Sequence, residues 1–265
     1  MTEIEENGNV RREGNKMKSN KLFIFALMIL IGTTSYADFK GSQLKYKRVR
    51  TAYSQKGEKI KELLHAQGIE PETVQIYLRA FKKERILQVW GKNKTDKTYK
   101  HIISYPFCMT SGQLGPKRKQ GDLQIPEGFY HIDRYNPWSN FYLSLGINYP
   151  NQSDRILGNK RDPGGDIFIH GACVTIGCIP ITDSKIKELY ILAVEARNNG
   201  QRRIPVTIFP AKLTDQEMKN LNWLYSKRPK LINFWKNIKQ GYDYFEAHKR
   251  LPRVTILPGG GYSFK

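Results

Sequence analysis

Short apolar runs that alternate with polar residues fill the middle of this chain. They begin near residue 74 and are separated by turns rich in lysine, asparagine, aspartate and glycine, a pattern that predicts β-strands. The first three such runs are Val74–Phe81, Arg85–Trp90 and Tyr99–Tyr105. Because only short turns separate these three strands, we predict an antiparallel meander.

The strand pattern continues beyond the meander, with one helical interruption. Four further strands are predicted at Gly128–Asp133, Phe141–Leu145, Asp166–His170 and Ile204–Phe209. Between the last two lies a helix, Asp183–Arg197, in which Asp183 is a candidate cap and which ends just before Gly200. The pattern over residues 74–210 therefore predicts a mainly β (α+β) domain with one inserted helix.

The segment before this domain, residues 38–73, shows little regular patterning. Residues 38–55 are basic and weakly patterned, which indicates a loose stretch of chain. Residues 57–67 carry apolar side chains at helical spacing and stop at Gly68, so a short helix is predicted there.

After Pro210 the spacing becomes helical again, over residues 211–265. Thr214 is a candidate helix cap, and Pro229 interrupts the apolar positions, so two helices are predicted. The residues from Arg253 onward indicate a last strand and a glycine-rich turn. We therefore predict a helical C-terminal extension to the β-rich domain.

The first 37 residues have the pattern of a secretory signal peptide. Lys18 and Lys21 precede the apolar run Leu22–Ile31, and small residues end the segment. Met17 lies where such signals begin, so we expect the stretch before it to reflect the choice of start site. The sequence therefore predicts a protein exported to the periplasm or cell envelope, with membrane contact only through this segment.

The chain is strongly basic, with a formal net charge of +20. Removal of the first 37 residues takes away five basic and four acidic side chains and leaves about +19. Such a charge favours polyanionic partners. Since the sequence has no nucleic-acid-binding motif and is expected to be exported, anionic envelope material fits better than nucleic acid. A basic surface without a dedicated partner is the alternative.

One glycine-punctuated loop holds the most concentrated chemistry. His170 ends an apolar strand, and Cys178 closes the loop that follows. A nearby imidazole is a common way to generate a reactive thiolate. Gly171 and Gly177 permit backbone shapes that would fold Cys178 back onto His170, and the Gly171 carbonyl would fix the imidazole tautomer. The N–H groups of Gly177 and Cys178 would hold an oxyanion, and Thr175 would shape the turn.

Two other roles for this loop stay open at this point. His170, Cys173 and Cys178 are candidate metal ligands, although no fourth ligand lies nearby in the sequence. A disulfide between Cys173 and Cys178 would make the loop purely structural, and export would preserve such a bond. The remaining cysteine, Cys108, is expected to be buried. Three cysteines allow at most one disulfide, so one thiol stays unpaired within the chain.

The loop resembles the signature of the L,D-transpeptidase catalytic (YkuD-type) domain, which is His-Gly, a loop, and then Ser/Thr-x-Gly-Cys. In this chain those parts are His170-Gly171 and residues 175–178. Upstream, residues 115–130 resemble the family's Thr-Pro-x-Gly-x-Tyr segment. The resemblance covers residues 74–209. It implies a β-rich catalytic fold that acts on peptidoglycan, with the cysteine as nucleophile and the histidine as base.

The departures from that signature point to one branch of the family. Most members have a longer loop, a second histidine before Gly-Cys and an arginine soon after the cysteine, whereas this chain has Ile176 and then Ile179-Pro180. The short loop, a cysteine at the position of Cys173 and the Gly-Pro-Lys-Arg stretch are similar to the YafK-like branch. That branch includes hydrolases, which release a protein attached to diaminopimelate.

We therefore predict an exported cysteine acyl-transfer enzyme that works on peptidoglycan stem peptides by transpeptidation or by hydrolysis. Lys117, Arg118 and Tyr130 are candidate substrate contacts, and a wall-attached envelope protein is a candidate partner. No cofactor or metal is expected. The alternative is a non-catalytic, basic envelope-binding protein with a structural Cys173/Cys178 disulfide.

Overall fold

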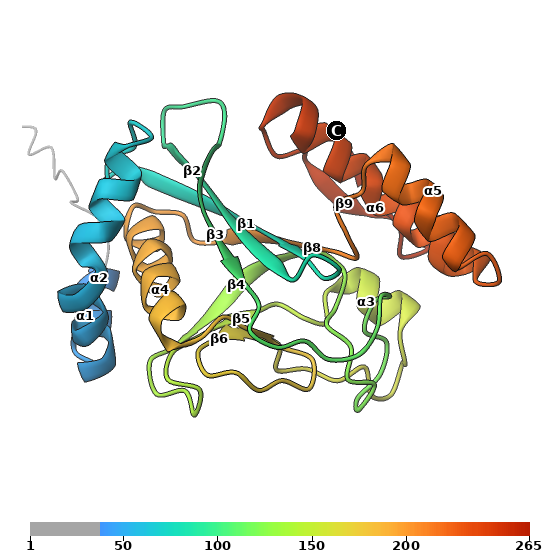
Figure 1. Ribbon diagram of the computed structural model, residues 1–265, viewed down its shortest axis with the longest axis horizontal. Coiled ribbons are helices and arrows are strands. Elements are labelled where there is room, and N and C mark those ends of the chain that lie inside the picture. The colour runs from blue at the N-terminus through green and yellow to red at the C-terminus, as the bar shows by residue number, and fades with distance from the viewer. Residues whose placement is uncertain (1–37) are drawn as a thin grey trace, which may run out of the picture. The chain divides into compact units, whose positions relative to one another are not determined.

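An eight-stranded mixed sheet forms the centre of the structure, a computed structural model that describes residues 38–265 (Figure 1). The strand order is β3-β2-β1-β8-β4-β5-β6-β7. The bounds are β1 Val74–Phe81, β2 Ile86–Asn93, β3 Lys100–Pro106, β4 Gly128–Asn136, β5 Ser144–Ile147, β6 Phe168–His170, β7 Ile179–Pro180 and β8 Ile204–Phe209. The predicted mainly β (α+β) class is confirmed, and the predicted signal peptide lies outside the described residues.

The first three strands form the predicted antiparallel meander, in which β1 pairs with β2 and β2 pairs with β3. The chain returns to the centre of the sheet through β8, which lies parallel to β1 and antiparallel to β4. β5 and β6 extend the sheet beyond β4, and β7 pairs in parallel with β6 at its edge. This edge carries the loop that contains the candidate nucleophile.

Two strands begin later than the alternating pattern predicts. The strand expected from Phe141 begins at Ser144, and the strand expected from Asp166 begins at Phe168. Tyr142 has a φ of 72° and Asp166 a φ of 53°, and these left-handed conformations cannot continue an extended strand. Both residues therefore belong to turns, although their neighbours have the composition of strands.

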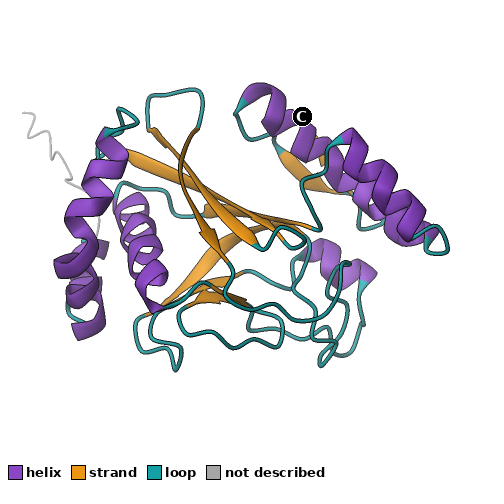
Figure 2. Cartoon of the chain, in the orientation of Figure 1, coloured by secondary structure: helices purple, strands orange, loops and turns teal. Residues whose placement is uncertain are grey.

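Three helices cover one face of the sheet (Figure 2): α1 Phe39–Leu44, α2 Lys47–His65 and α4 Asp183–Asn198. The prediction of a loose stretch over residues 38–55 is wrong. Asp38 caps α1 by accepting a hydrogen bond from the Gly41 N–H, and α2 buries Val49 and Ala52 against the core. Lysine and arginine residues on the outer side of α2 dominate its sequence, so the narrow apolar stripe is not recognisable from the hydrophobic pattern.

The C-terminal residues cover the opposite face, with α5 Asp215–Leu224, α6 Pro229–His248 and a hairpin of β9 Val254–Ile256 and β10 Tyr262–Phe264. Side chains alternate along a strand, so Phe81 packs in this layer while its neighbour Ala80 packs in the other. Thr214 caps α5 and Pro229 opens α6, which confirms the predicted cap and the predicted break.

One short helix, α3 Gln152–Leu157, has no signal in the hydrophobic pattern. A reciprocal pair of hydrogen bonds between Asn151 and Asp154 caps its beginning. The helix is too short for a repeating apolar stripe to appear. Within residues 38–265, no helix is both long enough and apolar enough to cross a lipid bilayer.

A buried ion pair ties the C-terminal layer to the segment that precedes β4. Lys82 Nζ lies 2.9 Å from Glu127 Oε1, and the Trp235 indole N–H donates to Glu127 Oε2 at 2.8 Å. The Gly115 N–H donates to the same carboxylate. Burial lowers the pKa of Lys82, while the Glu127 carboxylate opposes that shift. These contacts fix both ends of residues 115–127.

Candidate active site

A mostly apolar pocket of about 320 Å³ lies beside the loop that joins β6 to β7. It is lined by Met109, Phe141, His170, Val174, Thr175, Ile176 and Cys178. The imidazole and the thiol predicted to act together therefore border the same space. Parallel pairing of Ile169 with Ile179 holds the two ends of the loop side by side, since His170 ends β6 and Cys178 immediately precedes β7.

The His170 side chain is held in a single orientation. Its Nδ1 donates a hydrogen bond to the Gly171 carbonyl oxygen at 2.5 Å, and its ring lies against the Phe141 ring with centroids 4.5 Å apart. This bond places the proton on Nδ1, so Nε2 carries the lone pair that can accept a proton. Burial lowers the pKa of His170, partly offset by the Gly171 carbonyl, and the imidazole is therefore neutral at neutral pH.

Cys178 is the free cysteine among the described residues. Its Sγ accepts a hydrogen bond from the Phe168 N–H at 3.4 Å and lies 3.6 Å from the Asp166 carbonyl oxygen. Burial raises the pKa of the Cys178 thiol, whereas the Phe168 N–H and the charge of Lys117 act against that shift. The thiol and the imidazole thus border one pocket in their neutral forms, with no hydrogen bond between them in the described residues. The imidazole must therefore approach the sulfur and take its proton as the sulfur attacks.

Thr175 ties the end of the loop together. Its hydroxyl donates to the Cys178 carbonyl oxygen at 2.8 Å and accepts from the Gly177 N–H at 3.1 Å. The Gly177 N–H was expected at the oxyanion together with the Cys178 N–H, but here it is already engaged by Thr175. None of the hydrogen bonds within the described loop engages the Cys178 N–H, which leaves this group as the candidate oxyanion donor.

Replacing Gly177 by alanine should both destabilise the protein and lower activity. Gly177 has a φ of +138°, and an added Cβ would lie 3.0 Å from the Gln124 carbonyl oxygen. We expect a loss of about 1–3 kcal/mol in unfolding free energy, typical of a strained backbone position, because neither atom can move away cheaply. Gly165→Ala is the matched control, since its Cβ would meet nothing within 4 Å. Equal urea-unfolding midpoints for the two variants would contradict this account.

The disulfide joins Cys108 to Cys173, with Cα atoms 5.6 Å apart. The alternative of a Cys173–Cys178 disulfide is therefore wrong, and so is the expectation that Cys108 is a buried, unpaired cysteine. This pairing could not be predicted from the sequence, because Cys108 lies 65 residues before Cys173. Only the fold brings the end of β3 next to the loop between β6 and β7. Because its sulfur is bonded to Cys108, Cys173 is unavailable as a thiolate for the metal site considered from the sequence.

Removing this disulfide should lower stability while leaving Cys178 free. The double variant Cys108→Ser/Cys173→Ser should lose about 2–4 kcal/mol of unfolding free energy, because the cross-link closes a long loop in the unfolded chain. Urea unfolding with and without reductant checks this, and reductant should affect only the parent protein. Thiol titration of the unreduced, unfolded parent should find one free thiol. Three free thiols, or a reductant-insensitive parent, would refute the assignment.

The three predicted substrate contacts do not line the pocket. Lys117 is buried and its Nζ binds Asp122 Oδ1 at 2.7 Å, while the Tyr130 hydroxyl is buried and donates to the Glu127 carbonyl oxygen at 3.1 Å. Arg118 lies 3.4 Å from Asp154. Each polar end therefore already has a protein partner, and a role in substrate binding stays a prediction. Lys117 still reaches the site through its charge, which favours the Cys178 thiolate.

Sequence reasoning missed the supports on the other side of the loop. Asp183, predicted to cap α4, is instead the first residue of that helix and accepts a hydrogen bond from the Ala172 N–H at 2.7 Å. The Gly171 N–H donates to the Leu143 carbonyl oxygen at 3.1 Å. Phe141 and Met109 form pocket walls, although neither lies near the loop in sequence. Only the sheet pairing reveals these neighbours.

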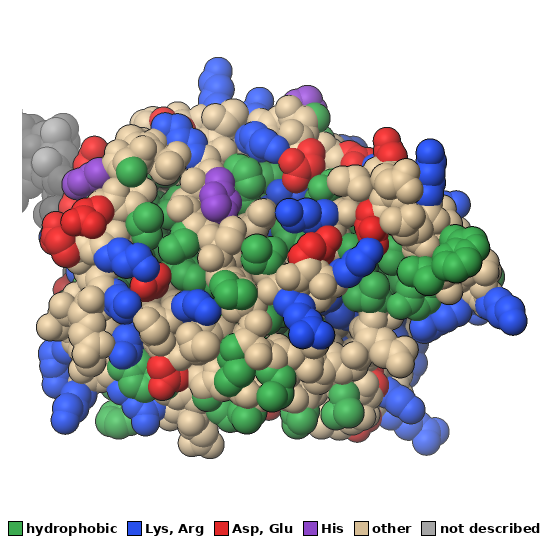
Figure 3. Space-filling view, in the orientation of Figure 1, with side chains coloured by type: hydrophobic (Ala, Val, Ile, Leu, Met, Phe, Trp, Pro, Cys, Tyr) green, Lys and Arg blue, Asp and Glu red, His purple; other side chains and the backbone are tan. Residues whose placement is uncertain are grey.

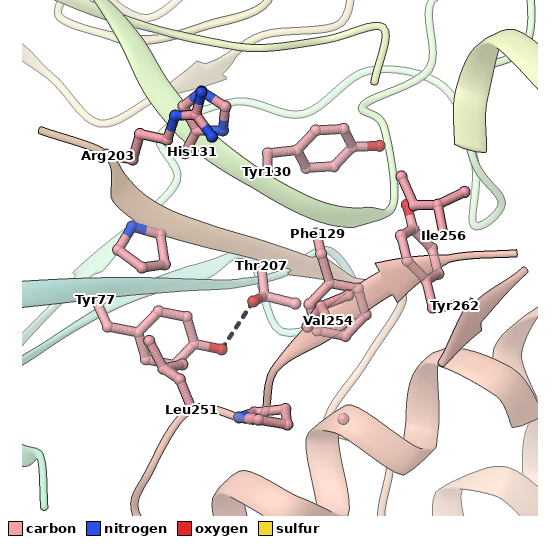
Figure 4. Close-up of a pocket in the computed structure, with 13 residues that line it drawn as sticks. Tyr77, Phe129, Tyr130, His131, Arg203, Thr207, Leu251, Val254, Ile256 and Tyr262 are labelled. Carbon is pink, nitrogen blue, oxygen red and sulfur yellow. Dashed lines mark hydrogen bonds between the residues drawn. The ribbon is translucent and has the colours of Figure 1, made fainter. Parts of the chain in front are cut away.

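A second cavity lies on the sheet face that the C-terminal layer covers (Figure 4). It has a volume of about 300 Å³. The Tyr77 hydroxyl donates to Thr207 Oγ1 at 2.8 Å on its wall, and Arg203 and His131 lie side by side at one end. No thiol borders this cavity. The pocket of His170 and Cys178 is therefore the candidate active site.

Comparison with known proteins places these features in a family. Residues 75–208 match the L,D-transpeptidase catalytic domain. Two relatives described as "Putative L,D-transpeptidase YafK", from Escherichia coli strain K12 and E. coli O157:H7, are each 34% identical over 241 residues, or 90% of this chain and 88% of the relative.

Solved structures are more distant. The helical cell shape determining protein Pgp2 from Campylobacter jejuni has a TM-score of 0.42 and 17% identity, over 75% of this chain and 80% of Pgp2. Bdellovibrio bacteriovorus Bd1075 has a TM-score of 0.38 and 22% identity, over 52% of this chain and 48% of Bd1075.

Proposed function

Because the chain belongs to the L,D-transpeptidase catalytic domain family, we propose that it is a cysteine acyl-transfer enzyme that acts on peptidoglycan stem peptides. The observation that carries the proposal is the pocket shared by His170 and Cys178, in which the Gly171 carbonyl fixes the imidazole with Nε2 as proton acceptor. The enzyme would work in the periplasm or cell envelope, where the predicted signal peptide would deliver it. The proposed reaction uses no cofactor or metal.

The first half of the proposed reaction forms a thioester. His170 Nε2 takes the proton from Cys178 Sγ, and the thiolate attacks the carbonyl carbon of a stem-peptide amide. The Cys178 N–H would donate to the oxyanion of the tetrahedral intermediate. When the C–N bond breaks, the imidazolium returns its proton to the departing amine. The products of this half are a free amine and an acyl group bonded to Sγ.

The second half depends on which nucleophile reaches the thioester. His170 would deprotonate a water molecule or an amine, which attacks the acyl carbon and expels the Cys178 thiolate. Water gives hydrolysis, and an amine gives a new amide bond. We propose hydrolysis of a diaminopimelate-linked amide, with a wall-attached envelope protein as the substrate partner, because the chain lacks the arginine that follows the cysteine in most members of the family.

Mass spectrometry of peptidoglycan fragments tests this proposal. Purified enzyme would be incubated with intact sacculi that carry attached protein, and with protein-free sacculi as the matched control. Hydrolysis should release protein from the first and produce no new cross-links in either. New diaminopimelate cross-links in the protein-free sample would instead assign transpeptidation. Unchanged fragments in both samples would contradict enzymatic action on peptidoglycan.

The alternative of a non-catalytic binding protein is less well supported. That alternative assumed a disulfide between Cys173 and Cys178, which would make the loop purely structural. In the structure, Cys173 is bonded to Cys108 and Cys178 is free. The net charge of +20 remains compatible with binding to anionic wall material by either kind of protein.

A further inference from the structure

The end of α5 presents an exposed apolar tip that the proposed reaction does not use. Trp223 is 79% exposed, the highest value among the large hydrophobic side chains of residues 38–265, and the adjoining Leu224 is 59% exposed. On the inner side of α5, Met218 and Leu221 are buried and fix the helix to the body of the protein. Trp223 and Leu224 therefore project from a firmly packed helix rather than from a loose chain end.

The turn that follows the tip is also held in place. The Tyr225 and Trp235 rings meet edge to face with centroids 4.9 Å apart, and Trp235 is fully buried at the base of α6. The Arg228 guanidinium lies 6.0 Å from the centre of the Tyr225 ring. The backbone that carries Trp223 and Leu224 is therefore held on both sides, by the buried face of α5 and by the anchored turn. Contiguous exposed apolar groups mark interaction surfaces, whereas single exposed side chains do not, and here Trp223 and Leu224 adjoin each other.

Basic side chains predominate around the turn that follows this tip, and the acidic residues earlier in α5, Asp215 and Glu217, are paired with Lys239 and Lys83. Residues 218–236 contain no aspartate or glutamate and five basic residues, all exposed: Lys219, Lys227, Arg228, Lys230 and Lys236. None of the five takes part in an ion pair within residues 38–265. In Figure 3, hydrophobic side chains gather at the right-hand edge, over the end of the molecule that carries α5, with lysine and arginine side chains around them.

A cationic pocket of about 390 Å³ adjoins the same turn. Arg228 and Lys230 line it together with Arg118, and Leu231 and Phe234 form part of its apolar wall. Arg118 already faces Asp154, so the two residues from the turn supply its unpaired charge. A pocket of this size accommodates a small phosphate-bearing group, and its Arg228 follows Trp223 and Leu224 across a single turn.

We propose that this end of the protein is a docking site for an anionic phospholipid surface. The pocket would hold a lipid phosphate against Arg228 and Lys230, while Trp223 and Leu224 enter the interface between the headgroups and the acyl chains. Tryptophan favours that region because its ring is apolar and its N–H is polar, and lysine and arginine add attraction to anionic lipids. The protein would therefore contact the membrane through α5 as well as through its predicted N-terminal segment.

Quenching of tryptophan fluorescence by brominated acyl chains tests this proposal in the full chain. The vesicles would contain phosphatidylglycerol and brominated phosphatidylcholine, with pure brominated phosphatidylcholine as the neutral control. The signal sums the four indoles of the chain, so the comparison of tryptophan variants separates the tip from any other segment that meets the bilayer. We expect strong quenching on anionic vesicles, its loss in Trp223→Ser, and its retention in Trp138→Ser, which removes another indole that is 71% exposed.

A charge-matched pair of variants tests the pocket. Arg228→Gln/Lys230→Gln should raise the anionic lipid concentration needed for half-maximal quenching by about 25-fold, since each basic residue near the surface contributes about fivefold. Lys94→Gln/Lys97→Gln removes the same charge from the exposed β2–β3 turn and should change it less than twofold. Equal effects of the two pairs, or equal quenching in wild type and Trp223→Ser, would overturn the proposal. So would a lipid-independent change in self-association caused by Trp223→Ser, which would assign the tip to a protein contact.

Discussion

Cys178→Ala should abolish turnover of peptidoglycan substrates, with a fall in rate of at least about 10⁴-fold. The reason is specific to the mechanism: alanine removes the only atom that forms the acyl-enzyme bond, and within residues 38–265 the other two cysteines are bonded to each other. No neighbouring side chain on the pocket wall offers an equivalent nucleophile, because the remaining lining is His170, Thr175 and apolar residues. Rates would be measured by chromatography of fragments released from sacculi.

The control for this variant must separate chemistry from folding. Cys178 accepts a hydrogen bond from the Phe168 N–H, a contact weak enough that its loss should barely change the unfolding midpoint. Binding to sacculi should also persist, because the basic surface is untouched. A Cys178→Ala protein that folds, binds and still processes substrate at the parent rate would refute the proposed nucleophile.

His170→Gln should lower the rate by about 10²–10⁴-fold at neutral pH, the usual range for loss of a general base. Glutamine fills much of the imidazole volume but cannot take the proton from Cys178. The matched control is His131→Gln, which replaces a histidine on the wall of the other cavity, away from the active-site pocket, and should retain the parent rate. A similar loss in both variants would point to general destabilisation.

The pH profile gives His170 a second readout. Burial lowers its pKa below the usual value of 6.5, so the neutral base persists as pH falls through 6.5 and activity should decline only at lower pH. In His170→Gln that acidic limb should vanish, and the rate should instead rise with pH toward the raised pKa of the Cys178 thiol. An acidic limb centred above 6.5 in the parent enzyme, or an unchanged profile in the variant, would contradict the assignment.

The sequence predicts the central sheet well because its strands obey a local rule. The meander, the helix that begins at Asp183 and the helix break at Pro229 all follow from alternation, helical spacing or the geometry of proline. The helices of residues 39–65 escape that reasoning, because their buried stripe is narrow and the surrounding lysine and arginine residues dominate the composition. The alternating pattern also wrongly extends two strands to include Tyr142 and Asp166, whose positive φ values place them in turns.

Some residues of the candidate site could also be predicted from the sequence, and others could not. His170, Thr175 and Cys178 could be chosen from the sequence because the loop that contains them is short and its chemistry is compact. The Cys108–Cys173 bond and the Phe141 wall could not, since each depends on strands that are distant in sequence and adjacent in the sheet. The burial of Lys117 against Asp122 could not be predicted either, because nothing local in the basic stretch before β4 indicates it.

The central claim is that Cys178 carries the acyl group during the reaction, and intact-protein mass spectrometry tests it most directly. The full chain would be mixed with a defined muropeptide and quenched in acid within a single turnover, then digested to locate any added mass. The account predicts an adduct with the mass of the acyl fragment on the peptide that contains Cys178, lost on treatment with hydroxylamine and absent from Cys178→Ala. Product formation without this adduct, or an adduct that persists in Cys178→Ala, would contradict it.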